Sequence, residues 1–179
     1  MYKKIAITNR HLCSNIIEQI KIINEYDFDY IILREKDLSE EEYFLLAEKA
    51  ISISDKIILH NFISSCESLK YYKIHLPYNL FKANIDKIKN YDIKGVSTHS
   101  LKEALDVERL GADYVTASHI FATKCKEGLE PKGTVWLENI CHNIKIPVYA
   151  LGGIDRQNAQ SCIDAGAKGV CMMSEAMRV

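Results

Sequence analysis

The stretch from residue 112 to 133, ADYVTASHIFATKCKEGLEPKG, combines a strand pattern with side chains that could do chemistry. Tyr114–Ser118 is rich in strand-forming residues and runs directly into His119. In a parallel barrel, a titratable residue at the carboxyl end of a strand faces the active-site mouth. The loop that follows adds hydroxyl, ammonium and thiol groups on Thr123, Lys124, Cys125 and Lys126. We therefore predict that His119 is catalytic, with a purely structural histidine as the alternative.

Two later segments place glycine and serine where an anion could bind: LGGID at 151–155 and MSEAM at 173–177. Paired glycines let a backbone approach a ligand closely, and a serine can start a short helix whose free N–H groups favour an anion. Barrels frequently bind phosphate between the loops after their seventh and eighth strands. The predicted phosphate ligands are Gly152, Gly153, Ser174 and Glu175. In the alternative interpretation, the two glycines only form a tight turn.

A third motif, LREK, holds two cations at the end of another apolar run. On an extended backbone, alternate residues point the same way, so Arg34 and Lys36 share a side. Such a pair suits a carboxylate or a pyrophosphate. Alternatively, the two cations are solvated and bonded to Glu35 or Asp37.

These residues are carried by a regular alternation of short apolar runs with amphipathic segments. The predicted strands are Lys4–Thr8, Tyr30–Leu33, Lys56–Leu59, Lys73–Leu76, Ile93–Ser97, Tyr114–Ser118, Val148–Leu151 and Gly169–Met173. Helix ends are signalled by Ser39 with Glu42, Ser100 with Glu103, Asp155, Gly111 and Gly166. Apolar strands that alternate with helices imply a parallel sheet buried on both faces, and eight of them favour a closed (β/α)8 TIM barrel.

The length of 179 residues predicts a single domain over 1–179. It is short for this barrel, which usually has about 250 residues. Only Ser174–Val179 follow the last predicted strand, so we expect a truncated final helix. A truncated barrel would expose an apolar wall that a second copy could cover, and we therefore predict a homo-oligomer.

The composition narrows the classes of partner. A net charge of −1 and a pI near 6.6 provide no basic face for nucleic acid and no polybasic membrane anchor. The six cysteines include no CxxC pair, and the first residues, MYKKIAITNR, do not form a secretory signal. We expect a reduced, cytoplasmic protein that binds a small molecule.

Read together, four segments resemble the thiamine phosphate synthase/TenI superfamily over essentially the whole chain. They are LREK, GVSTHS at 95–100, ADYV…HIFATKCK, and PVYALGGI…AGAKGV at 147–170. The resemblance implies a thiazole that bears a phosphate as the ligand, which agrees with the predicted phosphate site. It implies substrate-binding roles for Arg34, Lys36, Ser97, Thr123 and Lys126.

The chain departs from the synthase branch of this superfamily where that chemistry is concentrated. Asn61 stands where a metal-binding aspartate is expected, and HLPYNLF, which starts at His75, offers no second aspartate. Ile32 replaces a glutamine, and the Thr-x-Thr-Lys motif becomes Thr-Lys-Cys-Lys, ending at Lys126. Because Mg²⁺ prefers carboxylate and phosphate oxygens, we predict no metal and no cofactor, with Mg²⁺ required only if the chain is a synthase.

The same loop resembles the TenI branch, His-x-Phe-x-Thr-x-Cys-Lys followed by Gly-Leu. The matching residues are His119, Phe121, Thr123, Cys125, Lys126, Gly128 and Leu129. This resemblance implies a thiazole tautomerase, an isomerase that converts a carboxythiazole phosphate into its aromatic tautomer, with His119 as the proton shuttle. Histidine suits this role because its pKa of about 6.5 lets it act in both directions. The alternatives are thiamine phosphate synthase and a non-catalytic barrel that binds thiazole phosphate.

The other histidines have different interpretations. His11 and His142 lie outside the predicted mouth and are expected at the surface. His60, His75 and His99 fall near strand ends and raise the hypothesis of a metallohydrolase, although the chain has no His-x-His or His-Glu-x-x-His motif. Cys125 is a possible nucleophile, but a small residue in place of a threonine is the simpler interpretation.

Overall fold

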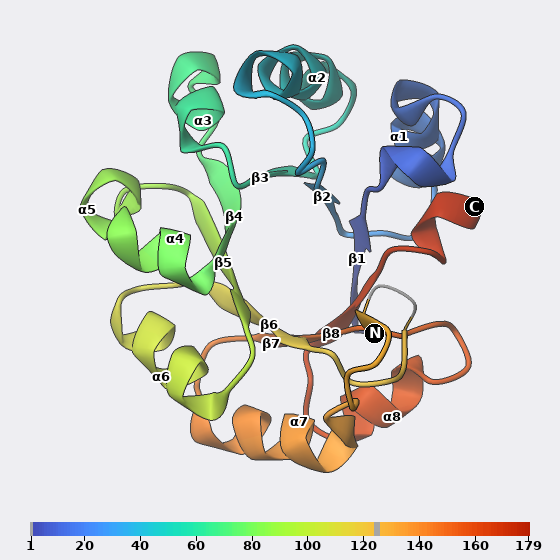
Figure 1. Ribbon diagram of the computed structural model, residues 1–179, viewed down its shortest axis with the longest axis vertical. Helices are drawn as coiled ribbons and strands as arrows, with labels where there is room; N and C mark the ends of the chain where they lie inside the picture. Colours follow the sequence, from blue (N-terminus) through green and yellow to red (C-terminus); the bar gives the residue numbers. More distant parts are fainter. Residues whose placement is uncertain (1, 124–125) are drawn as a thin grey trace.

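The computed structural model describes residues 2–123 and 126–179, and their strands form a closed barrel. Eight parallel strands pair in the order of the sequence, and β8 returns to β1 (Figure 1). The strands are β1 Lys3–Ile7, β2 Tyr30–Leu33, β3 Ile57–His60, β4 Lys73–Pro77, β5 Ile93–Thr98, β6 Tyr114–Ser118, β7 Val148–Leu151 and β8 Gly169–Met172. The predicted (β/α)8 fold is confirmed, because every predicted strand lies within one residue of the observed one.

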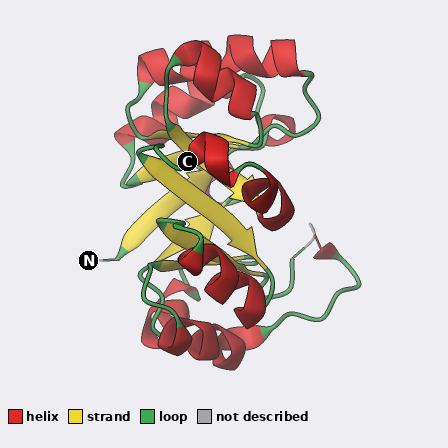
Figure 2. Cartoon of the chain, turned by 90° about the vertical axis from the view of Figure 1, so that its left-hand side faces the viewer, coloured by secondary structure: helices red, strands yellow, loops and turns green. Residues whose placement is uncertain are grey.

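Helices surround the barrel and cover the outside of its strands (Figure 2). They are α1 Ile16–Glu25, α2 Glu40–Ile53, α3 Ile63–Leu69, α4 Tyr78–Ala83, α5 Ile85–Ile88, α6 Leu101–Arg109, α7 Gly133–Asn143 and α8 Ala159–Asp164, with 3-10 turns η1 Arg10–Leu12 and η3 Ala176–Arg178. Ser39 and Glu42 form the predicted capping box of α2. At α6, Ser100 accepts from the N–H of Glu103, but the Glu103 carboxylate accepts from the N–H of His99. Of the two bonds in the capping box predicted for α6, the one from the Glu103 N–H to Ser100 is present, and the one from the Ser100 N–H to Glu103 is replaced by a bond from His99.

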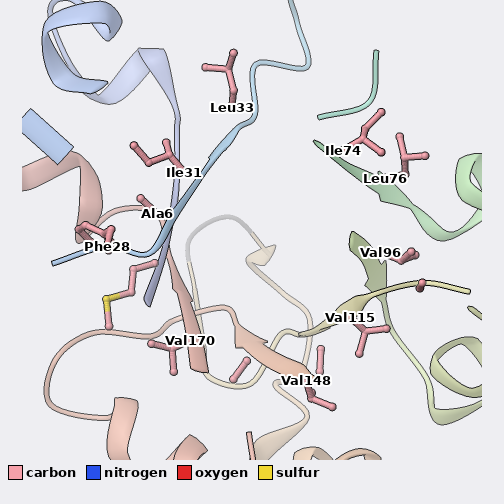
Figure 3. Close-up of a cluster of buried hydrophobic side chains, with 14 of the residues drawn as sticks. Ala6, Phe28, Ile31, Leu33, Ile74, Leu76, Val96, Val115, Val148 and Val170 are labelled. Atoms are coloured by element: carbon pink, nitrogen blue, oxygen red, sulfur yellow. The ribbon is translucent and has the colours of Figure 1, made fainter. Parts of the chain in front are cut away.

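The apolar core has two parts because successive strand residues point to opposite faces. The outer part lies between strands and helices, and Figure 3 shows Leu33, Leu76, Val115 and Val170 among its buried members. The inner part fills the barrel and consists of Ile5, Ile7, Ile32, Ile58, Tyr114, Tyr149 and Cys171. These inner side chains fill the barrel beneath the carboxyl ends of the strands, so the open space of the barrel lies at those ends.

The chain after β8 folds against α1, as its position beside that helix in Figure 1 shows. Gln19 of α1 donates to the carbonyls of Ala176 and Val179, at 3.4 and 3.3 Å. Ala176 and Met177 are buried, so η3 covers part of the wall that a complete helix would cover. In the residues described, the segment after β8 forms only the 3-10 turn η3, and the predicted homo-oligomer stays a prediction. Within residues 2–123 and 126–179, no helix is long and apolar enough to cross a membrane.

Candidate active site

A cavity of about 510 Å³ opens at the carboxyl ends of the strands. Its lining includes every predicted site residue: Arg34, Lys36, Ser97, His119, Thr123, Lys126, Gly152, Gly153, Ser174 and Glu175. The barrel thus brings together residues as far apart in the sequence as Arg34 and Glu175. Lys124 and Cys125 lie outside the described residues, and so does the question of a nucleophilic thiol.

His119 is held at the end of β6 with little freedom to move. Its side chain is buried, and its Nε2 lies 3.3 Å from the carbonyl oxygen of Leu129. The His119 carbonyl accepts from the N–H of Lys132 at 3.0 Å, which ties the two ends of the loop together. Because a carbonyl oxygen can only accept, Nε2 carries the hydrogen in this contact. In the neutral ring, Nδ1 is therefore the basic nitrogen.

The two glycines after β7 pack against the loop after β6. Gly152 has φ +104°, and a Cβ placed there would lie 2.3 Å from the Cβ of His119. Gly153 has φ +66°, and its Cβ would lie 2.4 Å from the carbonyl oxygen of Ala122. The tight-turn interpretation therefore describes a real structural requirement. Both glycines also line the cavity, so their contact with phosphate stays a prediction.

The segment after β8 differs from the prediction in its helix. The 3-10 turn begins at Ala176 instead of Ser174 and has three residues, with Glu175 at its N-cap. Glu175 pairs with Arg156 at 3.5 Å, whereas Ser174 is exposed at the rim of the cavity. So short a turn has a weak dipole, because the dipole grows with the number of aligned peptides. Any phosphate contact here would depend on individual N–H groups.

The carboxylates of the LREK segment are engaged away from the neighbouring cations. Glu35 is buried and accepts from the Thr8 hydroxyl at 2.7 Å and from the N–H of Arg10 at 3.0 Å. Asp37 accepts from the Arg10 guanidinium at 2.6 Å. The structure therefore contradicts the alternative in which Arg34 and Lys36 are bonded to these two carboxylates. The two carboxylates bind Thr8 and Arg10 after β1, whereas Arg34 and Lys36 line the cavity.

Several cationic side chains line the mouth of the cavity. Partial burial lowers the pKa of Lys36, and the charges of Arg34 and Lys126 lower it further. Burial also lowers the pKa of Lys126, assisted by the charge of Lys132. Lowered lysine pKa values mean that the protonated groups lack sufficient compensation. An anionic ligand would supply that compensation, so this rim suits a phosphate or a carboxylate.

The wall formed by β3, β4 and β5 carries a buried histidine network that the sequence interpretation missed. The ring of His75 is hydrogen-bonded on both sides: the Tyr114 hydroxyl lies 3.0 Å from Nδ1, and the Ser97 hydroxyl lies 2.8 Å from Nε2. Burial, followed by the charges of Lys36 and Arg34, lowers the pKa of His75 to about 3. His60 stacks on His75 at 5.9 Å between ring centroids. Strand alternation could have placed His75 inside the barrel, but not its partners on two other strands.

The described residues offer no cluster of ligands that would support the metallohydrolase hypothesis. Over residues 2–123 and 126–179, no group of three or more His, Cys, Asp or Glu side chains is placed to hold a metal ion. His99 is exposed, and its Nδ1 lies 3.2 Å from the hydroxyl of Ser118. His11 and His142 are exposed outside the cavity lining; His11 pairs with Asp37.

Fold and site together define a (β/α)8 barrel with a cavity mouth lined by Arg34, Lys36 and Lys126 and a buried histidine at the end of β6. The chain belongs to the thiamine monophosphate synthase family, whose model matches residues 5–176. It is 32% identical to the putative thiamine-phosphate synthase 2 of Aquifex aeolicus, over 94% of each chain. It is 35% identical to the thiamine-phosphate synthase of Halalkalibacterium halodurans, over 82% of this chain and 73% of that protein.

A solved structure agrees with this assignment at the level of the fold. The thiamine phosphate pyrophosphorylase from Pyrococcus furiosus superimposes with a TM-score of 0.84. The match covers 99% of this chain and 88% of the other, at 24% sequence identity. The family model and the two relatives confirm the superfamily inferred from the motifs, and the solved structure supports the fold.

The residues around the mouth do not fit the magnesium ion that a synthase reaction implies. Mg²⁺ requires near-octahedral oxygen ligands, usually one or two carboxylates together with phosphate groups. Asn61 follows β3 and Pro77 ends β4, and the described residues place no carboxylate of the cavity lining at these strand ends. The lining carboxylates that lie near β7 and β8 have partners: Asp155 accepts from the N–H of Asn158, and Glu175 pairs with a guanidinium.

Proposed function

We propose that this protein is a thiazole tautomerase, which moves a proton on a carboxythiazole phosphate so that the ring becomes aromatic. The observation that carries the proposal is the set of groups around the mouth. A buried histidine faces a cavity with a cationic rim, while the β3 and β4 ends lack carboxylates for a metal. This set suits acid–base chemistry on an anionic ligand.

In this reaction the anionic groups of the ligand are held by the cavity rim, and His119 faces the ring. Nδ1 of His119 takes a proton from one ring carbon, and the electron pair left behind moves into the ring. The protonated imidazole then returns the proton to another ring position. The positive charge on the imidazolium is transient, so protons and charge balance without any further reactant.

Coupling of thiazole phosphate to a pyrimidine pyrophosphate is the second candidate, because the relatives are named as thiamine-phosphate synthases and not as tautomerases. In that reaction, Arg34, Lys36 and Lys126 would bind the leaving pyrophosphate. The names support the coupling reaction, whereas the missing carboxylates support the proton transfer. One assay can separate the two.

The purified protein should be given the carboxythiazole phosphate with EDTA or with Mg²⁺, and the aromatic product should be followed over time. We expect equal tautomerisation rates in both conditions. In parallel, thiazole phosphate and the pyrimidine pyrophosphate should give little or no thiamine phosphate. Robust coupling that needs Mg²⁺ would assign the protein as a synthase, and ligand binding without turnover would leave a non-catalytic binding barrel.

A further inference from the structure

Three side chains on neighbouring strands form a hydrogen-bonded chain from the barrel interior to the cavity. Tyr114 of β6 is 5% exposed, and its hydroxyl lies 3.0 Å from Nδ1 of His75 on β4. Nε2 of His75 lies 2.8 Å from the hydroxyl of Ser97 on β5. His75 and Ser97 line the cavity, whereas Tyr114 lies below it. The chain therefore ends at the ligand space with the Ser97 hydroxyl.

The direction of these bonds follows from the buried phenol. In the part of the chain that the structure describes, His75 is the hydrogen-bond partner found for the Tyr114 hydroxyl. If Nδ1 carried the hydrogen, the phenol O–H would be buried without an acceptor, which is costly. The phenol therefore donates to Nδ1. Because burial keeps His75 neutral, its single hydrogen lies on Nε2 and is donated to Ser97.

The fold holds the phenol in this position by leaving room for its ring. A Cβ on Gly95 of β5 would lie 2.1 Å from ring carbon Cζ of Tyr114, so glycine is required beside the ring. Tyr149 packs edge-on against the other side, with 5.2 Å between ring centroids. The ring cannot swing away from His75 without displacing one of these neighbours.

We propose that Tyr114 is a positioning residue that fixes the tautomer of His75 and keeps the Ser97 hydrogen free to donate into the cavity. In the opposite tautomer, Nε2 would accept that hydrogen and Ser97 could only accept from a ligand. The site therefore selects a substrate that presents a hydrogen-bond acceptor to this wall. This inference rests on the proposed function, in which the acceptor is the ring carboxylate of the thiazole.

Nuclear magnetic resonance tests the tautomer without any turnover. A ¹H–¹⁵N long-range correlation spectrum of the free protein distinguishes an Nε2–H imidazole from an Nδ1–H imidazole. We expect His75 in the Nε2–H form, and we expect Tyr114→Phe to populate the Nδ1–H form. Tyr149→Phe is the matched control, because it removes a phenol from the same inner layer and should leave the tautomer unchanged. An Nδ1–H form in the unmodified protein overturns the proposal.

Calorimetric binding tests the consequence with two aromatic probes that differ in one group, the aromatic carboxythiazole phosphate and the thiazole phosphate without the carboxylate. Ser97→Ala should weaken binding of the first about tenfold, since a hydrogen bond to a charged group is lost, and should change the second less than about twofold. Tyr114→Phe should reduce the same preference, and Ser97→Ala should then add little to it. Equal losses for both probes would contradict the role of Ser97.

These measurements separate the present inference from the proposed function. A protein that binds both probes with the expected preference but does not convert the non-aromatic carboxythiazole phosphate would retain the Tyr114 role and lose the tautomerase assignment. Turnover by a protein whose His75 is in the Nδ1–H form would support the tautomerase assignment and overturn the Tyr114 role. Circular dichroism of each variant shows that it is folded before binding is compared.

Discussion

At the scale of single residues, His119 is the group on which the proposed proton transfer depends. Its Nε2 contacts the Leu129 carbonyl, so the ring is oriented before a ligand arrives. Orientation matters because a base must lie within hydrogen-bond reach of the proton that it abstracts. A buried ring with one nitrogen engaged cannot rotate freely, which keeps Nδ1 available in one direction.

His119→Asn tests this role, because it keeps a polar side chain of similar size and removes the titratable ring. Positioned acid–base catalysis is typically worth about 10²–10⁴-fold, so the tautomerisation rate should fall by that factor. Affinity for the aromatic product should stay within about threefold, because the ionic contacts of the rim are kept. Rates and binding constants for both proteins measure the effect.

The matched control is His142→Asn on α7, where the histidine is exposed and its Nδ1 bonds the Glu138 carbonyl. This variant should keep the rate of the unmodified protein. The pH–rate profile adds a second criterion, since His119→Asn should lose the limb that the imidazole creates. An unchanged rate in a folded His119→Asn protein would remove His119 from the mechanism.

At the scale of elements, the loops after β6 and β7 act as one unit. The N–H of Ile120 donates to the Leu151 carbonyl at 3.1 Å, and the N–H of Phe121 donates to the Gly152 carbonyl at 3.0 Å. These bonds continue the strand pairing beyond the barrel and carry it past His119. The position of His119 is thus defined by two adjacent loops, and a change in one loop should displace residues of the other.

Gly152→Ala is predicted to displace His119. The new Cβ would meet the His119 Cβ at 2.3 Å, in addition to the strain of a φ of +104°. Gly111→Ala is the matched control, because Gly111 has φ +89° but nothing lies within 4 Å of its Cβ position. The control should lose about 1–2 kcal/mol of unfolding free energy with full activity. Gly152→Ala should lose more stability and at least about tenfold in rate, measured by urea unfolding and the tautomerisation assay.

If both variants kept full activity, the contact between Gly152 and His119 would not position the catalytic ring. If both lost activity equally, the backbone strain common to the two glycines would be the cause. Only a loss confined to Gly152→Ala supports the coupling of the two loops.

The elements also show which features a sequence alone predicts. Apolar runs and the Ser39 box depend on residues close together in the chain, so β2, β6 and the start of α2 could be located from pattern. The bond from Thr8 to Glu35 and the contacts of His75 join different strands and depend on barrel register. The start of η3 was also predicted wrongly. Ser174 would mark a helix start only if helical backbone followed it directly, but the 3-10 turn begins at Ala176.

At the scale of the whole molecule, charge is arranged in layers along the barrel axis. The rim carries Arg34, Lys36 and Lys126, while the layer beneath it contains His60 and His75. The rim charges help to lower both histidine pKa values, after burial as the main cause. The interior therefore stays neutral below a positive rim, which directs an anionic ligand to the mouth and keeps charge out of the core.

This layering predicts loss of stability in mild acid. Burial lowers the pKa of His75 to about 3 and that of His60 well below its usual value, whereas an unfolded histidine titrates near 6.5. As pH falls below about 6.5, the unfolded chain binds protons that the folded chain does not, so the unfolding free energy decreases. Each histidine contributes a slope of up to about 1.4 kcal/mol per pH unit, until pH reaches its folded pKa.

Urea unfolding at several pH values between 7.5 and 4.5 measures the slope. His60→Gln and His75→Gln should each flatten it by one such contribution, while His142→Gln should leave it unchanged because that side chain is exposed. Equal slopes in all four proteins would show that the two inner histidines are protonated in the folded barrel.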